Sequence, residues 1–304
     1  MLLACGSADS SEASTEETVA TSSTEATQVL SGGGGSEDGT EGGISTPTAA
    51  IEAGLSTDGT VVNSSANGQL ADVVLVQSND VLNFRFGPGV NFAIAGNFPP
   101  TATNLSLTNV TDVVDGSIWV FIEGAGWVNS FFLTSSTSSE EFASDLDAQD
   151  LIFNLAGVFE SRGNLTQITS WRGLHLGQLG DVDKIRSSEV PNLLTDPTAL
   201  YWGQCQEGEC NAGTFAEQVG DAYLSTIYDD GVRVLTNTLI PGPNGAASET
   251  IIPEEFQNFH FIAIHDPGDN PDFDGLDWMT WYVFIELTPD GPQVVGLLLD
   301  QWQP

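Results

Sequence analysis

Apolar and polar residues alternate in several short stretches between residues 70 and 134, a pattern typical of strands with one buried face. Leu82, Phe84 and Phe86 alternate with Asn83 and Arg85, and the Gly-Pro-Gly sequence that follows predicts a turn. Further strand-like runs, separated by turn residues, occupy Ile94–Phe98, Leu105–Val110, Ser117–Ile122 and the residues after Gly126. Five short strands in roughly 65 residues predict a small β-barrel over residues 70–134.

The pattern after residue 145 changes from helical spacing to alternation. Leu151, Leu155, Val158 and Phe159 recur at helical spacing and predict an early helix, which follows a linker at residues 135–144. Shorter helical segments are predicted at Leu165–Trp171, Ser187–Leu194 and Phe215–Tyr228, and strands at Val232–Ile240, Phe256–His265, Trp278–Leu287 and Val294–Trp302. Early helices followed by an antiparallel sheet predict an α+β domain over residues 145–304, so the expected fold class of the chain is mainly β or α+β.

Two blocks of the first region carry a family resemblance. A signature L-N-V-R-x-G-P-G is matched by the block Leu82–Gly89, and a closing G-W-V followed by Y-L is matched by Gly126-Trp127-Val128 with Phe131, Phe132 and Leu133. With these blocks, residues 71–134 resemble a bacterial SH3 domain. The resemblance implies a small barrel that binds cell-wall glycan or peptide stems, or serves as a spacer, without catalysis.

Three aromatic residues of this region are candidates for a wall-contact or peptide-contact surface, namely Phe92, Trp119 and Trp127, because aromatic rings give a large contact area at low entropic cost. Alternation leaves open the alternative in which Trp119 and Trp127 fill the barrel. Arg85 is the sole positive charge between residues 70 and 134, whereas the resemblance implies basic surroundings. Anionic wall polymers are therefore disfavoured as ligands.

The second region also carries resemblances, although weaker ones. Its order of elements is similar to the cone-shaped α+β folds of the nuclear-transport-factor superfamily, where early helices cap a curved sheet around a pocket. The ending Val294–Trp302 resembles the close of uncharacterised modules that accompany SH3-like domains on bacterial lipoproteins. These resemblances imply no known reaction, and they leave open a small-molecule pocket or a fold that its own aromatic side chains fill.

The first residues of the chain resemble a lipid-attachment signal. Leu2-Leu3-Ala4-Cys5 is similar to the lipobox of bacterial lipoproteins, which implies a lipid on Cys5 and a truncated signal peptide. The alternative is a chance cysteine in a disordered tail. Residues 6–69 are rich in Ser, Thr, Gly, Ala and Glu and have no basic residue, so too little apolar surface is available to order them, and we predict a disordered acidic tether.

The charge of the chain excludes some partners. The 304 residues include 42 acidic and 6 basic side chains, which give a formal net charge of −36. A field of that sign repels nucleic-acid phosphates and anionic headgroups, so we expect no nucleic-acid partner and no membrane contact other than the N-terminal lipid.

The two remaining cysteines lie close together, at Cys205 and Cys210. A turn through the intervening residues would bring the thiols within bridging distance in an oxidising compartment, so a local disulfide is predicted. The alternatives are a zinc site, which would need two further ligands, and a redox-active pair.

Catalytic motifs are absent from the sequence, which has no nucleophile elbow, phosphate loop, dinucleotide fingerprint or H-E-x-x-H. His260 and His265 lie five positions apart in one predicted strand and therefore on opposite faces. Pairs of carboxylates for glycosidic cleavage can be drawn from Glu254, Glu255, Asp277, Glu286 and Asp300, but 42 acids always supply some such pair. We assign no catalytic residue, and a non-catalytic protein is favoured.

One acidic loop is a candidate calcium site. Alignment of Gly275 with the glycine of a D-x-D-x-D-G loop places Asn270, Asp272 and Asp274 at ligand positions, with Asp277 just beyond. Trp281 stands where such a loop has a bidentate Glu, so the alternative is a solvated acidic turn, and no other cofactor is expected.

Together these patterns predict a lipid-anchored, extracytoplasmic protein of the cell envelope that uses an SH3-like module to associate with peptidoglycan or another envelope protein. Two alternatives stay open. The α+β domain could contain a pocket for a small ligand, or the chain could be an exported hydrolase.

Overall fold

The computed structural model describes residues 69–178, 181–198, 200–206, 209–241, 252–268, 270–273 and 275–301. Cys5 and all but the last residue of the predicted tether lie outside these ranges, so the lipid and the tether stay predictions. Two sheets with few helices confirm the mainly β, α+β fold class. Within the described ranges, no helix has the length and apolar character needed to cross a membrane.

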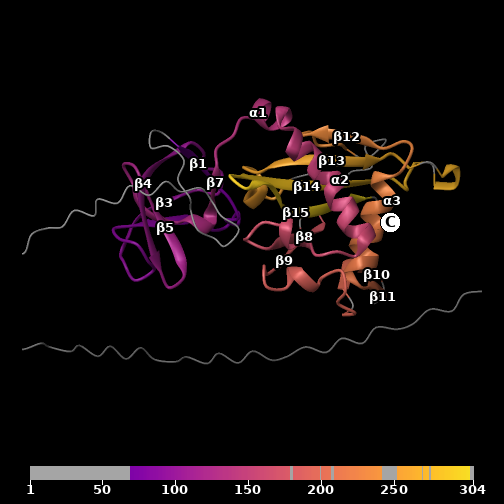
Figure 1. Cartoon of the computed structure of the whole chain (residues 1–304), viewed down its shortest axis with the longest axis horizontal. Coiled ribbons are helices and arrows are strands. Elements are labelled where there is room, and N and C mark those ends of the chain that lie inside the picture. Colours follow the sequence, from indigo (N-terminus) through magenta and orange to yellow (C-terminus); the bar gives the residue numbers. More distant parts are fainter. Residues whose placement is uncertain are drawn as a thin grey trace, which may run out of the picture. The chain divides into compact units, whose positions relative to one another are not determined.

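The first sheet is antiparallel and curls on itself (Figure 1). Its strands lie in the order β3-β2-β6-β5-β4-β1-β7. They are β1 (Leu70–Val73), β2 (Leu82–Arg85), β3 (Ile94–Phe98), β4 (Leu105–Val114), β5 (Ser117–Ile122), β6 (Gly126–Asn129) and β7 (Leu133–Ser135), with a 3-10 helix at Ser130–Phe132 between the last two. The five strands predicted from alternation are thus present, and β1 and β7 extend the sheet beyond β4.

Alternation along β5 divides its side chains between two environments. Val120 and Ile122 face the core of the curled sheet, whereas Trp119 and Phe121 point to its other face. The core consists of Ala71, Val73, Val76, Leu82, Val120, Ile122, Val128 and Leu133. Neither Trp119 nor Trp127 belongs to this cluster, so the alternative in which these two rings fill the barrel is wrong.

The second sheet is mixed, with the order β12-β13-β14-β15-β8-β9. Its strands are β8 (Leu174–Gln178), β9 (Asp181–Ile185), β12 (Arg233–Thr236), β13 (His260–Asp266), β14 (Met279–Thr288) and β15 (Gly291–Gln301). The predicted antiparallel order holds for β12 to β15, but β15 pairs with β8 in parallel. The β8–β9 hairpin was not predicted, nor was the separate hairpin of β10 (Leu200–Gln206) and β11 (Glu209–Gly213).

Helices cover one face of this mixed sheet. They are α1 (Ser139–Ser144), α2 (Leu146–Ser161), and a π-helical segment, Ala216–Asp221, that continues into α3 (Ala222–Ile227). Helix α1 corrects the predicted linker at 135–144, because Ser138 and Glu141 form a capping box that starts a helix there. The helical segments predicted at 165–171 and 187–194 are single 3-10 turns, Leu165–Gln167 and Val190–Asn192, and another such turn is Glu254–Phe256.

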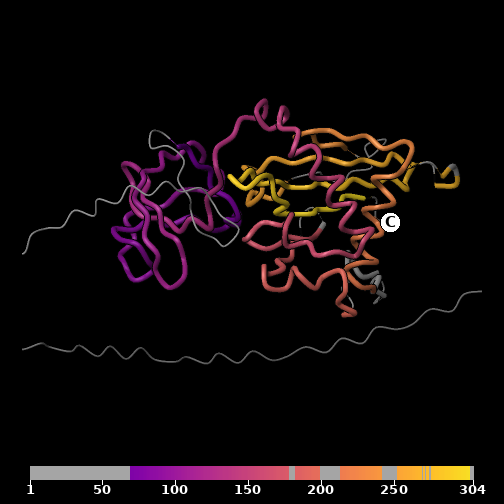
Figure 2. Tube along the Cα trace, in the orientation of Figure 1, coloured from indigo at the N-terminus to yellow at the C-terminus, as the bar shows by residue number. Residues whose placement is uncertain are grey.

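Both faces of the mixed sheet are buried, and the chain can be followed through them in Figure 2. Along β13, Ile262 and Ile264 pack under the helices, while Phe261 and Ala263 face a second core. Val74, which follows β1 of the curled sheet, packs into that second core. A strand that is buried on both faces needs apolar residues at every position, which explains the continuous apolar run in β13 and β14.

The curled sheet and the mixed sheet lie within one compact unit and are joined by the buried side chain of Arg172. Arg172, which precedes β8, donates from Nε to the Glu286 carboxylate at 2.8 Å. Its two terminal nitrogens donate to the carbonyl oxygens of Ser130, Phe131 and Leu133 in the curled sheet. From the other side, Asn258 donates to the Val73 carbonyl at 2.7 Å. These polar contacts fix how the two sheets face each other.

Candidate functional site

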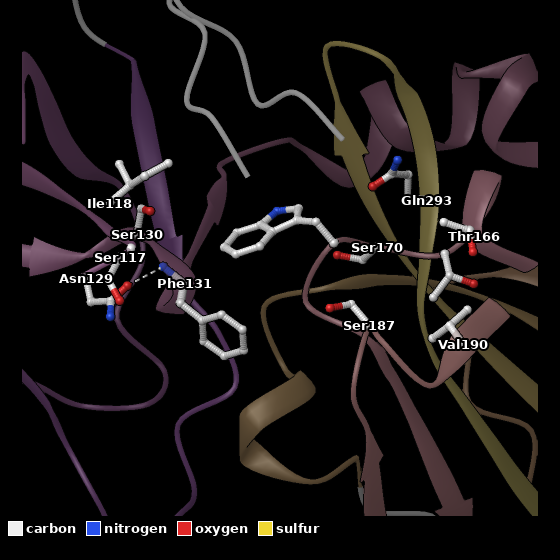
Figure 3. Close-up of a pocket in the computed structure, with 13 residues that line it drawn as sticks. Ser117, Ile118, Asn129, Ser130, Phe131, Thr166, Ser170, Ser187, Val190 and Gln293 are labelled. Carbon is white, nitrogen blue, oxygen red and sulfur yellow. Dashed lines mark hydrogen bonds between the residues drawn. The ribbon is translucent and has the colours of Figure 1, made fainter. Parts of the chain in front are cut away.

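Two cavities lie between the curled sheet and the mixed sheet, and the first has a volume of about 430 Å³. The curled sheet lines one side of it with the β4–β5 turn and the end of β6, and the mixed sheet lines the other (Figure 3). We call it the neutral cavity, because none of its lining residues carries a charge. The lining residues are Gly116, Ser117, Ile118, Asn129, Ser130, Phe131, Thr166, Thr169, Ser170, Trp171, Ser187, Val190 and Gln293.

Backbone pairing with β15 holds the loop that presents Trp171 to the neutral cavity. Thr169 forms an isolated parallel bridge with Val294, and the Ser170 N–H donates to the Val294 carbonyl at 2.8 Å. Gly173 then turns the chain into β8 with a φ of +96°, and a Cβ there would collide with the Ile185 carbonyl. A glycine is required at this position because both its backbone conformation and its surroundings exclude a side chain.

Several polar groups in the neutral cavity have no partner among the described residues. The Ser117, Thr169 and Ser187 hydroxyls and the Gln293 amide form no hydrogen bond there. The Nε1 donor of Trp171 is buried and likewise has no hydrogen-bond partner in the described part of the chain. Buried polar groups are normally hydrogen-bonded, so the buried Thr169, Gln293 and Trp171 Nε1 groups favour a polar ligand, whereas the exposed Ser187 hydroxyl is open to solvent.

Aromatic rings supply the apolar part of the same cavity. The Phe131 and Trp171 rings meet edge to face, with their centroids 5.6 Å apart. Asn129 accepts a hydrogen bond from the Phe131 N–H at 2.9 Å, and this starts the 3-10 helix that carries the ring (Figure 3). The Arg172 guanidinium lies 4.7 Å from the Trp171 ring centroid and makes a cation–π contact with this ring.

The second cavity, of about 520 Å³, adjoins the first at Asn129 and Phe131. We call it the cationic cavity, because Arg85 and Lys184 line it together with the buried His175. Burial lowers the pKa of the His175 imidazole to about 4, and the charges of Lys184 and Arg172 contribute to this lowering. Burial and Arg172 also lower the pKa of the Lys184 amine.

The three predicted contact aromatics lie in different environments. Phe92 is exposed, Trp127 is half-buried and meets the Phe121 ring edge to face, but Trp119 is only 4% exposed and lines the cationic cavity. Trp119 therefore does not contribute to the exposed surface that the sequence suggested. Alternation could not show this, because it does not reveal that residues of the mixed sheet line the same cavity as Trp119.

The predicted cysteine and calcium sites are only partly within the described residues. Cys205 lies in β10 and Cys210 in β11, which pair as adjacent antiparallel strands, and the disulfide stays a prediction. Asp274 lies outside the described residues. Asn270 and Asp277 use side-chain oxygens to accept backbone N–H groups of the loop itself, at 3.0 and 2.9 Å. Among the described residues, no group of three or more His, Cys, Asp or Glu side chains could hold a metal, and the calcium site stays a prediction.

The candidate catalytic groups do not converge. His260 stacks on Phe142 and hydrogen-bonds the Thr137 carbonyl, whereas His265 hydrogen-bonds the Thr280 hydroxyl. Burial lowers the pKa of both imidazoles. Among the acids that the sequence offers as carboxylate pairs, Glu286 forms the buried ion pair with Arg172. Glu255 is the one member of this set that lines a cavity, the cationic cavity. The acids drawn from the sequence as possible pairs are therefore not brought together in either cavity within the described residues.

Comparison with known proteins yields no match to a family model, a curated protein or a solved structure. The site therefore rests on its own geometry. Most of the residues that line the neutral cavity were not singled out from the sequence, because isolated Ser, Thr, Asn and Gln residues in loops are too common to signal a site.

Proposed function

We propose that this protein is a lipid-anchored envelope protein that binds an uncharged glycan, such as the glycan strand of peptidoglycan, in the neutral cavity. The observation that carries the proposal is the lining of this cavity, which combines two aromatic rings with hydroxyl and amide groups and has no charge. A sugar offers the matching surfaces, since its ring carbons pack on an aromatic face and its hydroxyls donate and accept hydrogen bonds.

The net charge of the chain supports an uncharged ligand. A formal charge of −36 repels polyanionic wall polymers, whereas a neutral glycan experiences no such repulsion. The resemblance of residues 71–134 to a bacterial SH3 domain supports a wall-associated role from an independent direction. In this proposal the module does not act alone, because the residues of the mixed sheet complete its binding surface. The proposed site lies between the two sheets, whereas the alternative drawn from the sequence is a small-ligand pocket in the α+β domain.

Replacement of Trp171 by Ala should weaken binding to purified, polyanion-free peptidoglycan roughly tenfold, because the variant loses the largest ring of the cavity. Binding is measured by co-sedimentation at several ionic strengths. Gln293→Ala should weaken binding by a smaller factor, since it removes only an amide. Phe153→Ala, which removes an exposed ring of α2 outside the cavity lining, is the matched control. Equal retention of Trp171→Ala and Phe153→Ala, with both variants folded by circular dichroism, would overturn the proposed site.

The anchor is tested separately on Cys5. With a functional signal peptide in front of it, the chain should partition into membranes, and Cys5→Ala should move it into the soluble exported fraction, because a lipid needs the thiol for its attachment. Fractionation followed by immunoblotting measures this. Cys205→Ala is the control that keeps Cys5. A Cys5→Ala variant that stays in the membrane fraction would exclude the lipid anchor and leave glycan binding untouched.

A further inference from the structure

Cations are rare in this chain, and three of the six are paired with a carboxylate in the described structure. Arg162, Arg172 and Arg186 contact Asp221, Glu286 and Glu189 at 2.6, 2.8 and 3.8 Å. The described part of the chain shows no carboxylate within 4.0 Å of the remaining three, Arg85, Lys184 and Arg233. With 42 acidic residues available, a cation without an acidic partner is unexpected. Two of these three cations, Arg85 from β2 and Lys184 from β9, line the same cavity.

Both cations are held in place by groups that do not neutralise them. Arg85 donates from one terminal nitrogen to the Phe92 carbonyl at 2.7 Å, which leaves its other donors free of described partners. The Lys184 ammonium lies 4.2 Å from the centroid of the Phe131 ring. Cross-strand pairing places Lys184 opposite His175 of β8. Lys184 is exposed at the cavity, and its cation–π contact leaves the ammonium charge without a neutralising partner among the described residues, so an anion bound there would interact favourably with it.

His175 provides the second, independent indication of a ligand. Its side chain lines the cationic cavity and is only 9% exposed, and its Nε2 atom has no hydrogen-bond partner among the described residues. A buried imidazole nitrogen without a partner costs free energy unless a ligand or water satisfies it. Arg85, Lys184 and His175 come from three strands of two sheets, so the docking of the sheets creates their common cavity.

The rest of the lining defines the kind of anion. Aliphatic and aromatic side chains make up most of it, namely Leu75, Val76, Val81, Leu82, Val90, Trp119, Phe131, Phe132 and Val182. Asp80 and Glu255 also line the cavity and balance the two cations. This balance disfavours a polyanion but accepts a single negative charge. A volume of about 520 Å³ lies within the range of small-molecule sites, roughly 300–1,000 Å³.

We infer that the cationic cavity is a binding site for a small monocarboxylate with an apolar body, in which Lys184 and Arg85 bind the carboxylate and the ring of Trp119 packs on the apolar part. The inference does not rest on glycan binding, since none of these three residues lines the neutral cavity. A free amino acid and the carboxyl end of a peptide share this chemistry. Asp80 or Glu255 would contribute only to a ligand that also carries an ammonium.

The probe for the test is N-acetylphenylalanine, and its uncharged amide is the matched control ligand. Titration calorimetry at low salt should show the acid bound at least tenfold more tightly than the amide. Lys184→Met and Arg85→Gln should each weaken binding of the acid at least tenfold. Arg233→Gln, which removes the other cation without an acidic partner, should leave the affinity unchanged. Free phenylalanine and glycyl-phenylalanine then distinguish an amino acid from a peptide end as the preferred source of the carboxylate.

A second readout follows from the composition, because Lys184 is the only lysine of the chain. Protein labelled with [¹³C]lysine gives a single ε-methylene signal, whose pH titration reports the pKa of this one amine. Addition of N-acetylphenylalanine should raise that pKa, and the amide should not. Any of three results would overturn the inference. The acid and the amide could bind equally tightly, or Lys184→Met could bind the acid as tightly as the native protein does. The third is a lysine pKa that stays unchanged at saturating N-acetylphenylalanine. Lys184→Met should still bind peptidoglycan, which would distinguish the cationic cavity from the neutral cavity.

Discussion

Replacement of Glu286 by Gln should lower the free energy of unfolding by about 3–5 kcal/mol, the range for a buried ion pair that loses one partner. Arg172 and Glu286 are both only 2% exposed, and Nε of Arg172 lies 2.8 Å from the carboxylate. Glutamine keeps the size of the side chain but leaves the guanidinium charge uncompensated in the interior. Urea unfolding followed by tryptophan fluorescence and by circular dichroism measures the change.

Asp221→Asn is the matched control for this prediction. It removes the carboxylate from the Arg162–Asp221 pair, whose side chains are 39% and 50% exposed, so the change should stay within about 1 kcal/mol. The double variant Arg172→Met, Glu286→Leu should recover part of the lost stability, because neither charge of the pair remains in the interior. Recovery stays incomplete, since the Phe131 and Leu133 carbonyls lose their donor. A Glu286→Gln variant no less stable than Asp221→Asn would contradict a buried charge at this junction.

The second large effect is a loss of stability on mild acidification, as the pH falls from about 6.5 to 4. The folded pKa of His175 is about 4, and the ordinary value of 6.5 applies to the unfolded chain. Between these values the unfolded state binds a proton that the folded state does not, so stability is complete above pH 6.5 and decreases as the pH falls. A difference of this size corresponds to about 3 kcal/mol.

Unfolding free energies at half-unit steps of pH measure this loss. His175→Gln should remove most of the slope between pH 6.5 and 4.5, while His265→Gln should remove less, because the pKa of His265 is lowered by a smaller amount. Carboxylates whose pKa values are lowered in the folded state, such as Glu141 and Glu217, change the unfolding free energy only at lower pH. If the unfolding free energy of His175→Gln falls with pH as steeply as that of the native protein, the His175 imidazole does not have the lowered pKa of a buried neutral base.

The sequence predicts those elements whose signal is local. Val120 and Ile122 alternate with Trp119 and Phe121, and this alone places a strand and its two faces. The β8–β9 hairpin lacks such a signal, since its strands have five residues each and include Gly177, Asp181 and Asp183. Its main partner is β15, where Gly296 pairs with His175 from 121 positions away. Tertiary pairing of this kind overrides local propensity, which is why the sequence predicts helical turns before and after this hairpin but no strand within it.

The candidate sites were less predictable than the fold, for a related reason. The sequence predicts Trp119 to lie on an exposed contact surface, and it could not show that this ring is buried and lines a cavity together with Lys184 and His175. Trp171 was assigned only to a helical turn. Each cavity combines side chains from two sheets, and the Arg172 side chain that connects these sheets contacts carbonyls 39 to 42 positions before it and a carboxylate 114 positions after it.

The position of β15 also determines the order in which the chain can fold. This strand is the last one described along the sequence, yet it lies between β14 and β8 in the sheet. The β8–β9 hairpin and the Trp171 loop therefore have no sheet to pair with until β15 has been made, and closing so long a loop is slow. Nascent chains should then stay open and sensitive to protease over residues 165–185 until synthesis passes residue 301. Because β15 lies between β14 and β8, the six-stranded sheet forms as one unit only after this strand has joined it.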